Sequence, residues 1–196
     1  MSVHLRGALA AFVLAVLAAC GGGGGGDSEG GSGGATTTTT TTTTDSTVAA
    51  LGDRVQRFLV SSQTHVQGQV DYPQTPPVGG AHNPTWWNCG FYSSSIVPEL
   101  AVHSMEHGAV WIAFRPSLPD DQVASLRQLA RRPYVLVAPW ADDSIPAPVV
   151  ASAWGLQLRA DTAADPAVAA FVEAYAQGPQ TPEPGARCTG GFGDPE

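Results

Sequence analysis

Histidines are the residues of this chain that are best suited to chemistry, and they are clustered. The chain has five histidines, and four of them, His65, His82, His103 and His107, fall within one short part of the sequence. The imidazole ring is a common ligand for zinc, copper and other transition metals. The clustering therefore predicts a metal site, and we expect the metal to be copper or zinc.

The geometry of His103 and His107 depends on the local secondary structure. On a helix the two side chains lie one turn apart, with about 5–6 Å between their Cβ atoms, and can bind one ion. On a strand they would lie about 13 Å apart, at about 3.3 Å per residue. Pro98-Glu99 as a start and Gly108 as a stop favour a helix. We therefore expect His103 and His107 to bind the same ion.

The other ligands are expected from an earlier loop. His82, together with His65, would complete the site from the proline-rich loop at residues 71–88, and Glu106 would be a fourth ligand or would orient a histidine. Met105 is a further candidate near the ion, because a thioether favours Cu(I). A structural role is the alternative, since histidines near the end of a helix can hydrogen-bond backbone carbonyl groups there.

The sequence from His103 to His107 also matches the H-x-x-E-H motif of inverted zinc proteases, in which two histidines bind zinc and the glutamate activates water. In a hydrolase of this kind Glu106 would be the catalytic residue. Proteases of that type are much larger, and no downstream glutamate is an evident third ligand. We therefore expect a binding protein rather than an enzyme.

A binding or interaction module without metal is the alternative from another class. Its surface would be lined by aromatic side chains, which are Tyr72, Trp86, Trp87 and Phe91. Such a surface could bind peptidoglycan, a peptide or another protein of the cell envelope.

The N-terminal residues 1–19 have the features of a bacterial lipoprotein signal peptide. The apolar run from Ala8 to Ala19 is shorter than the roughly 20 residues of a spanning helix, and it ends in the small-residue sequence Leu17-Ala18-Ala19-Cys20. The thiol of Cys20 would be acylated and would anchor the protein outside the cytoplasm, to the cell membrane or the outer membrane. An uncleaved anchor segment is the alternative. Residues 20–47, rich in glycine and threonine, predict a disordered tether.

Residues 48–196 are expected to form a single globular domain. The formal net charge is −8, and all nine basic residues are arginines, so the sequence argues against binding to nucleic acid. Once Cys20 is assigned to lipid, Cys89 and Cys188 are left, and in an oxidising compartment they are expected to form one disulfide. A metal ligand or a nucleophile is the alternative for either thiol.

Apolar patterns and helix signals predict an α/β fold (α+β is possible), with a small sheet of three to four strands, helices packed on it, and the proline-rich loop before it. Strands are expected at residues 109–114, 134–138 and 149–158, helices at 119–132 and 165–178, and a further leading helix at 48–60.

Several short motifs together resemble a bacterial family, that of domain of unknown function 3105. The motifs are His65-Val66-Gln67-Gly68, Tyr72-Pro73, Pro76-Pro77-Val78-Gly79-Gly80-Ala81-His82, Trp86-Trp87-Asn88-Cys89-Gly90, Val102-His103-Ser104-Met105-Glu106-His107-Gly108 and Cys188-Thr189-Gly190-Gly191. The resemblance implies a secreted or anchored protein and no established activity. It marks all four clustered histidines and Glu106 as pattern positions, whereas Met105 departs from it, since leucine is expected there.

Overall fold

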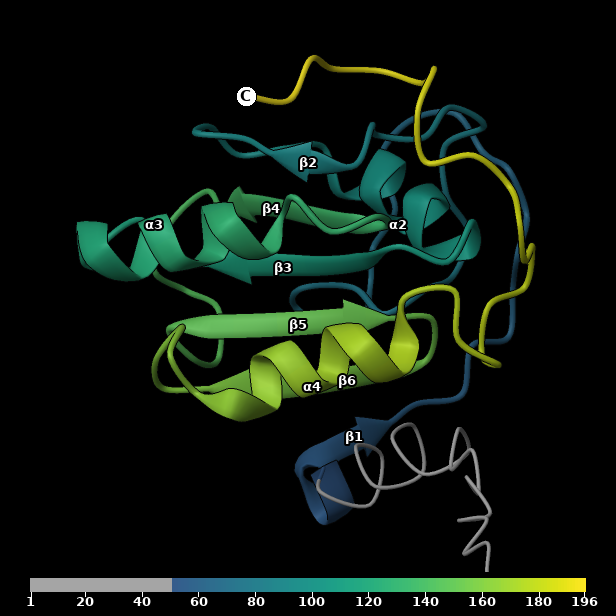
Figure 1. The fold of residues 1–196 in the computed structure, drawn as a ribbon. Coiled ribbons are helices and arrows are strands. Elements are labelled where there is room, and N and C mark those ends of the chain that lie inside the picture. The colour runs from purple at the N-terminus through teal and green to yellow at the C-terminus, as the bar shows by residue number, and fades with distance from the viewer. Residues whose placement is uncertain (1–50) are drawn as a thin grey trace, which may run out of the picture. The chain divides into compact units, whose positions relative to one another are not determined.

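The computed structural model describes residues 51–196, which fold around one six-stranded mixed sheet (Figure 1). The strand order is β1-β6-β5-β3-β4-β2. The elements are the 3₁₀ turn η1 (Gly52–Arg54), β1 (Val55–Arg57), β2 (Gly90–Phe91), α2 (Pro98–Glu106), β3 (Val110–Phe114), α3 (Asp120–Leu129), β4 (Val135–Pro139), β5 (Val149–Ala153), β6 (Leu156–Ala160) and α4 (Pro166–Tyr175). The predicted signal peptide, the lipidation of Cys20 and the tether lie outside the described residues.

The central strand β3 is buried on both faces of the sheet, and it therefore separates two cores. Successive side chains of a strand point to opposite faces. Ile112 packs into one core with side chains of α3 and α4, whereas Trp111 packs into the other core with side chains of α2. Helices α3 and α4 thus cover one face of the sheet, while α2 and the proline-rich loop cover the other.

Three of the predicted helices are confirmed as α2, α3 and α4. Helix α4 begins where the cap signal placed it, because the Asp165 side chain accepts a hydrogen bond from the Ala167 amide at 2.9 Å and Pro166 occupies the first turn. Helix α2 likewise begins at Pro98 and ends before Gly108, which has φ +95°. The α2 helix is what fixes the relative positions of the candidate site residues.

The sheet is larger than predicted, for three reasons. The segment expected as one strand at residues 149–158 is a hairpin of β5 and β6, which turns at Gly155 with φ +70°. The helix expected at residues 48–60 does not continue beyond Leu51: Gly52–Arg54 form η1, and Val55 to Arg57 form β1, because they pair antiparallel with β6 and bury Val55. A two-residue strand, β2, pairs parallel with β4.

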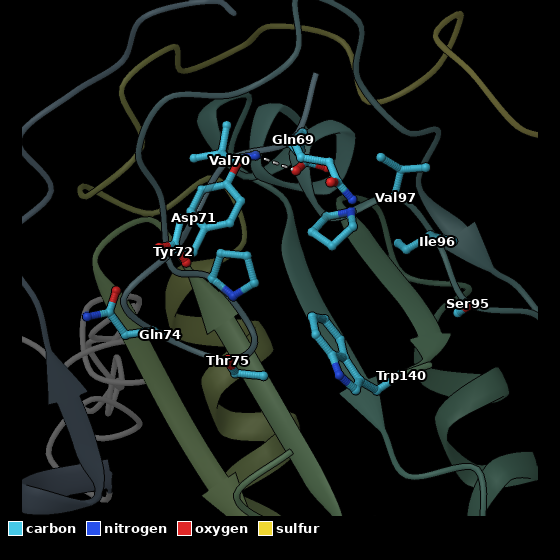
Figure 2. A pocket seen from close by; sticks show the side chains of 13 residues that line it. Gln69, Val70, Asp71, Tyr72, Gln74, Thr75, Ser95, Ile96, Val97 and Trp140 are labelled. Atoms are coloured by element: carbon cyan, nitrogen blue, oxygen red, sulfur yellow. Dashed lines mark hydrogen bonds between the residues drawn. The ribbon is translucent and has the colours of Figure 1, made fainter. Parts of the chain in front are cut away.

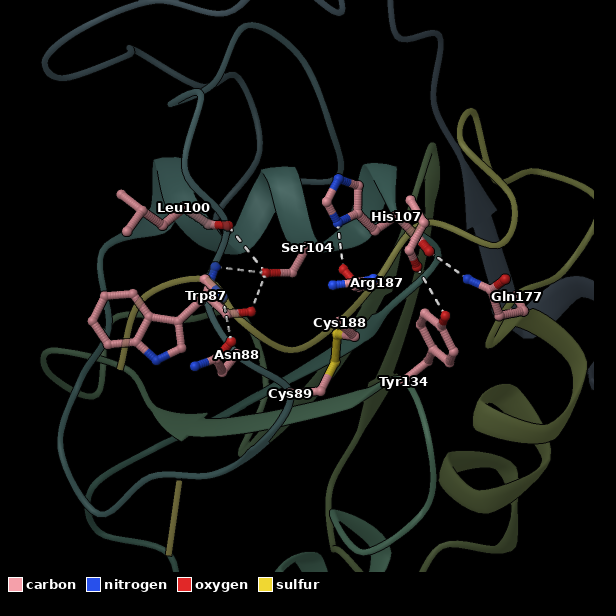
Figure 3. The surroundings of a disulfide bond; sticks show 12 residues. Trp87, Asn88, Cys89, Leu100, Ser104, His107, Tyr134, Gln177, Arg187 and Cys188 are labelled. Carbon is pink, nitrogen blue, oxygen red and sulfur yellow. Dashed lines mark hydrogen bonds between the residues drawn. A yellow bond between two sulfur atoms is a disulfide. The ribbon is translucent and has the colours of Figure 1, made fainter. Parts of the chain in front are cut away.

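The predicted disulfide between Cys89 and Cys188 is present (Figure 3). It joins the end of the proline-rich loop to the C-terminal segment, and the Cys89 amide also donates to the Cys188 carbonyl at 2.8 Å. Further along, the Phe192 amide donates to the carbonyl of Trp86. The C-terminal segment is therefore held against the loop that carries His82.

Among the residues that the structure describes, no helix is both long and apolar enough to cross a lipid bilayer.

Candidate metal centre

Two parts of the chain bring the candidate ligands together. Helix α2 supplies His103 and Glu106, which are three residues apart and therefore lie on one face of the helix. The segment before α2 supplies His65 and His82, which form an isolated parallel bridge in which the Val66 amide donates to the His82 carbonyl at 2.7 Å.

Four side chains form a compact group. One donor atom from each of His65, His82, His103 and Glu106 lies within 4.8 Å of the others. The Oε2 atom of Glu106 is 2.9 Å from Nε2 of His82 and 3.6 Å from Nε2 of His65. A tetrahedral ion with bonds of about 2.0–2.1 Å holds its ligand atoms about 3.3 Å apart. Small side-chain rotations would thus suffice to place all four atoms around one ion.

Backbone carbonyl groups fix the tautomers of the two buried histidines. Nδ1 of His82 lies 2.8 Å from the Gly80 carbonyl, and Nδ1 of His103 lies 2.7 Å from the Asn83 carbonyl. A carbonyl oxygen only accepts, so each Nδ1 carries the proton and each neutral ring has its lone pair on Nε2. Metal-binding histidines use the same arrangement to orient the ring and its lone pair.

The contact between His82 and Glu106 requires either a proton or a metal cation between the two atoms. Both side chains are buried, with exposed fractions of 0% and 4%. The Nε2 lone pair of a neutral His82 and an ionised carboxylate oxygen at 2.9 Å would repel each other, because both are acceptors. A proton shared by the pair would resolve this contact alone. A metal cation would resolve it and also engage the lone pair of His103.

The ring of His103 is held neutral by its surroundings. The pKa of His103 is lowered to about 4, mainly by burial and also by the neighbouring His107, His82 and His65, against the opposing effect of the hydrogen bond to the Asn83 carbonyl. A neutral imidazole is the form that binds metal.

Of the four grouped side chains, His65 is the exposed one. The side chain of His65 is 47% exposed, whereas His103 and Glu106 are buried. Trp86 packs against His103 with 5.7 Å between ring centroids, and Trp154 packs against His82 with 6.0 Å. An ion would therefore enter and leave past His65.

Comparison with known proteins identifies the family of this chain. Residues 65–190 match the family described as protein of unknown function (DUF3105). The chain belongs to this family. The match begins at His65 and contains every residue of the four-membered group, in agreement with the resemblance of the motifs. No curated protein and no solved structure matches the chain.

Two predicted site residues of this DUF3105 domain lie outside the group. His107 donates from Nδ1 to the Arg187 carbonyl at 2.7 Å, and its Nε2 is 3.5 Å from Oε2 of Glu183. Met105 is fully buried in the core between α2 and the sheet. Glu106, and not His107, belongs to the group together with His103. The inverted protease pattern differs, because there two helical histidines bind one ion.

The aromatic residues of the DUF3105 domain do not form one exposed surface. Trp87 and Phe91 are buried and belong to different cores. Tyr72 instead lines a cavity of about 800 Å³ between the loop and the start of α2, together with Trp140 and Glu99 (Figure 2). Glu99 accepts a hydrogen bond from the Val70 amide at 2.8 Å. The cavity is a separate feature, because none of the four grouped residues lines it.

Sequence reasoning missed the groups that orient the rings. The carbonyl oxygens of Gly80 and Asn83 belong to the loop, and the Arg187 carbonyl and Glu183 belong to the C-terminal segment. Any residue type provides a carbonyl, so no residue type marks these positions. Only the glycines around residue 80, with φ of +141° and +125° at Gly79 and Gly80, signal that the backbone takes an unusual path there.

Proposed function

We propose that this DUF3105 domain binds one divalent transition-metal ion through His65, His82, His103 and Glu106. The observation that carries the proposal is the convergence of four ligand atoms, one from each of these side chains, within 4.8 Å of one another. The two buried rings each use Nδ1–H on a backbone carbonyl and turn Nε2 into the group, where the buried carboxylate also points.

Zinc and Cu(II) are the ions that this donor set fits best. Three imidazole nitrogens and one carboxylate oxygen suit both ions. A preference for Cu(I) is not supported, because Met105 lies in the core and Cys89 and Cys188 are joined to each other. Cu(II) binds more tightly than zinc to a given nitrogen and oxygen site, so availability in the cell would decide which ion is bound.

Binding, rather than catalysis, is the function that this geometry supports. Four protein ligands complete a tetrahedral shell, whereas catalytic zinc sites use three and leave one position for water or substrate. His65 is an exposed ligand and is therefore free to detach from the ion. We infer a role in holding and releasing the ion.

The location that we propose is outside the cytoplasm, with the domain attached to a bacterial membrane by a lipid on Cys20. The Cys89–Cys188 disulfide supports the compartment, because disulfides persist in oxidising environments. The anchor rests on the sequence Leu17-Ala18-Ala19-Cys20.

Titration of the metal-free full chain with Zn(II) and Cu(II) tests the proposal. We expect one equivalent to bind with a Kd below about 10 µM, and His65→Ala to weaken binding by about tenfold or more. His107→Asn is the matched control, because this histidine follows α2 directly but lies outside the group. Absence of binding below about 10 µM, or an equal loss in both variants, would overturn the assignment.

A further inference from the structure

Three arginines line one pocket on the surface of the domain. Arg131 and Arg132 follow the C-terminal end of α3, and Arg187 comes from the C-terminal segment. The pocket has a volume of about 390 Å³, and the Cys89–Cys188 disulfide forms part of its wall. It is separate from the four-membered histidine and glutamate group, none of whose residues line it.

Three cationic side chains line this pocket, although the net charge of the whole chain is −8. Two of the other described arginines form salt bridges: Arg54 pairs with Asp165, and Arg127 pairs with Glu196. Within residues 51–196, no salt bridge is formed by any of the three pocket arginines. Three exposed cationic side chains at one pocket make the local potential positive, which attracts anions.

The helix end alone does not account for this arrangement. Two arginines after α3 would be explained by the negative end of the helix. Arg187, however, is brought there from far along the chain, and its neighbour Cys188 is cross-linked to Cys89. The carbonyl of Arg187 is also held by His107. The backbone position of the third arginine is therefore fixed independently of the helix.

The wall of the pocket contains a backbone conformation that is unfavourable for its residue. Tyr134 has φ +57°, in the left-handed region where a bulky side chain is rarely found. Its hydroxyl donates to the Ala186 carbonyl at 2.8 Å, which links the start of β4 to the segment that carries Arg187 (Figure 3). Strained residues of this kind occur preferentially at functional sites.

We propose that this pocket binds a phosphate group. The planar guanidinium fork matches the oxygens of phosphate and carboxylate alike. Three unneutralised arginines favour the ion of higher charge, which is a phosphate dianion rather than a single carboxylate. The phosphate can belong to a small soluble ester or to the headgroup of an anionic phospholipid, and the chemistry of recognition is the same for both.

Titration with inorganic phosphate tests this site in the full chain, held in neutral detergent and treated with a chelator so that no metal contributes. At low ionic strength we expect a Kd below about 1 mM, and Arg187→Gln and Arg132→Gln to weaken binding by about tenfold each. Arg159→Gln is the matched control, because it removes the same charge from an exposed position on β6 outside the pocket.

The outcomes separate the possibilities. Phosphate binding weaker than about 10 mM, or an equal loss in the Arg159 and Arg187 variants, would overturn the proposal. Repeating the titration in nanodiscs distinguishes the two sources of phosphate. Weaker phosphate binding in phosphatidylglycerol nanodiscs than in phosphatidylcholine nanodiscs identifies a lipid headgroup as the competing ligand. Equal binding in both identifies a soluble phosphate ester as the ligand.

Discussion

Nε2 of His82 lies 2.9 Å from Oε2 of Glu106, and the opposite nitrogen of the same ring lies 2.8 Å from the Gly80 carbonyl. The ring thus has an acceptor at each end, although a neutral imidazole has only one N–H to donate. His82 is fully buried, so water does not separate the two acceptors. This pair is where addition of a cation, or removal of the carboxylate charge, would have the clearest effect.

Glu106→Gln is expected to separate metal binding from folding. The amide group can donate N–H to Nε2 of His82, so the metal-free variant should keep or exceed the thermal stability of the wild-type chain. Metal affinity should fall by about tenfold or more, because the anionic ligand is lost. Thermal unfolding with and without Zn(II) measures both effects. A variant with unchanged zinc affinity would contradict the assignment of Glu106 as a ligand.

Acid is expected to destabilise the metal-free chain through His103. The unfolded chain takes up a proton on this ring below about pH 6.5, whereas burial delays protonation in the folded chain until about pH 4. The unfolded state therefore binds more protons between these values. The contribution of the neutral ring, on the order of 2–3 kcal/mol, is present above pH 6.5 and lost as the pH falls towards 4.

Urea unfolding of the metal-free wild-type chain and of His103→Asn, at pH 7 and pH 5, measures this contribution. The free energy of unfolding should fall more steeply towards pH 5 in the wild-type chain than in the variant. Equal slopes would show that another group is responsible.

Ser104→Ala should destabilise the packing of α2 on the loop. The buried Ser104 hydroxyl accepts from the Trp87 amide at 3.0 Å and donates to the Trp87 carbonyl at 2.7 Å. Its loss deprives the Trp87 carbonyl of this donor, at a cost of about 1–3 kcal/mol, whereas the Trp87 amide keeps the Leu100 carbonyl as an acceptor at 3.2 Å. In the control Ser125→Ala, the lost hydrogen bond to the Asp121 carbonyl is exposed, and a change below about 0.5 kcal/mol is expected. Chemical denaturation of both variants measures the change in the free energy of unfolding that each substitution causes.

Mass spectrometry of the N-terminal peptide tests the proposed anchor. From bacterial membranes we expect a peptide that begins at Cys20 and carries acyl chains. Cys20→Ser should lack this peptide. A wild-type chain that begins at Met1 with an unmodified Cys20 would contradict the prediction.

The helices were predictable because their signals are local. Pro98 before α2, Asp165 and Pro166 at α4, and the apolar stripe of α4 all lie within the elements that they specify. The edge strands β1 and β2 were not predictable, because they are held by pairing with β6 and β4, which are distant in sequence. The Gly155 turn was visible in the sequence, but a glycine within an apolar run does not by itself distinguish a bulge from a hairpin.

For the site, helical spacing did not decide which neighbour accompanies His103. Residues three and four positions further along a helix both lie on the same face, so Glu106 and His107 were equally placed. The structure separates them through a contact over a separation of 80 residues, in which Nδ1 of His107 donates to the Arg187 carbonyl. No local pattern reports such a contact.

Because the group draws its donors from the loop at His65 and His82 and from α2, it does not exist in the unfolded chain. On the proposed function, an ion would bind the native state alone and would shift the folding equilibrium by mass action. A free ion concentration one hundred times the Kd corresponds to about 2.7 kcal/mol of added stability. Resistance of the domain to proteolysis would then follow the supply of metal in its surroundings.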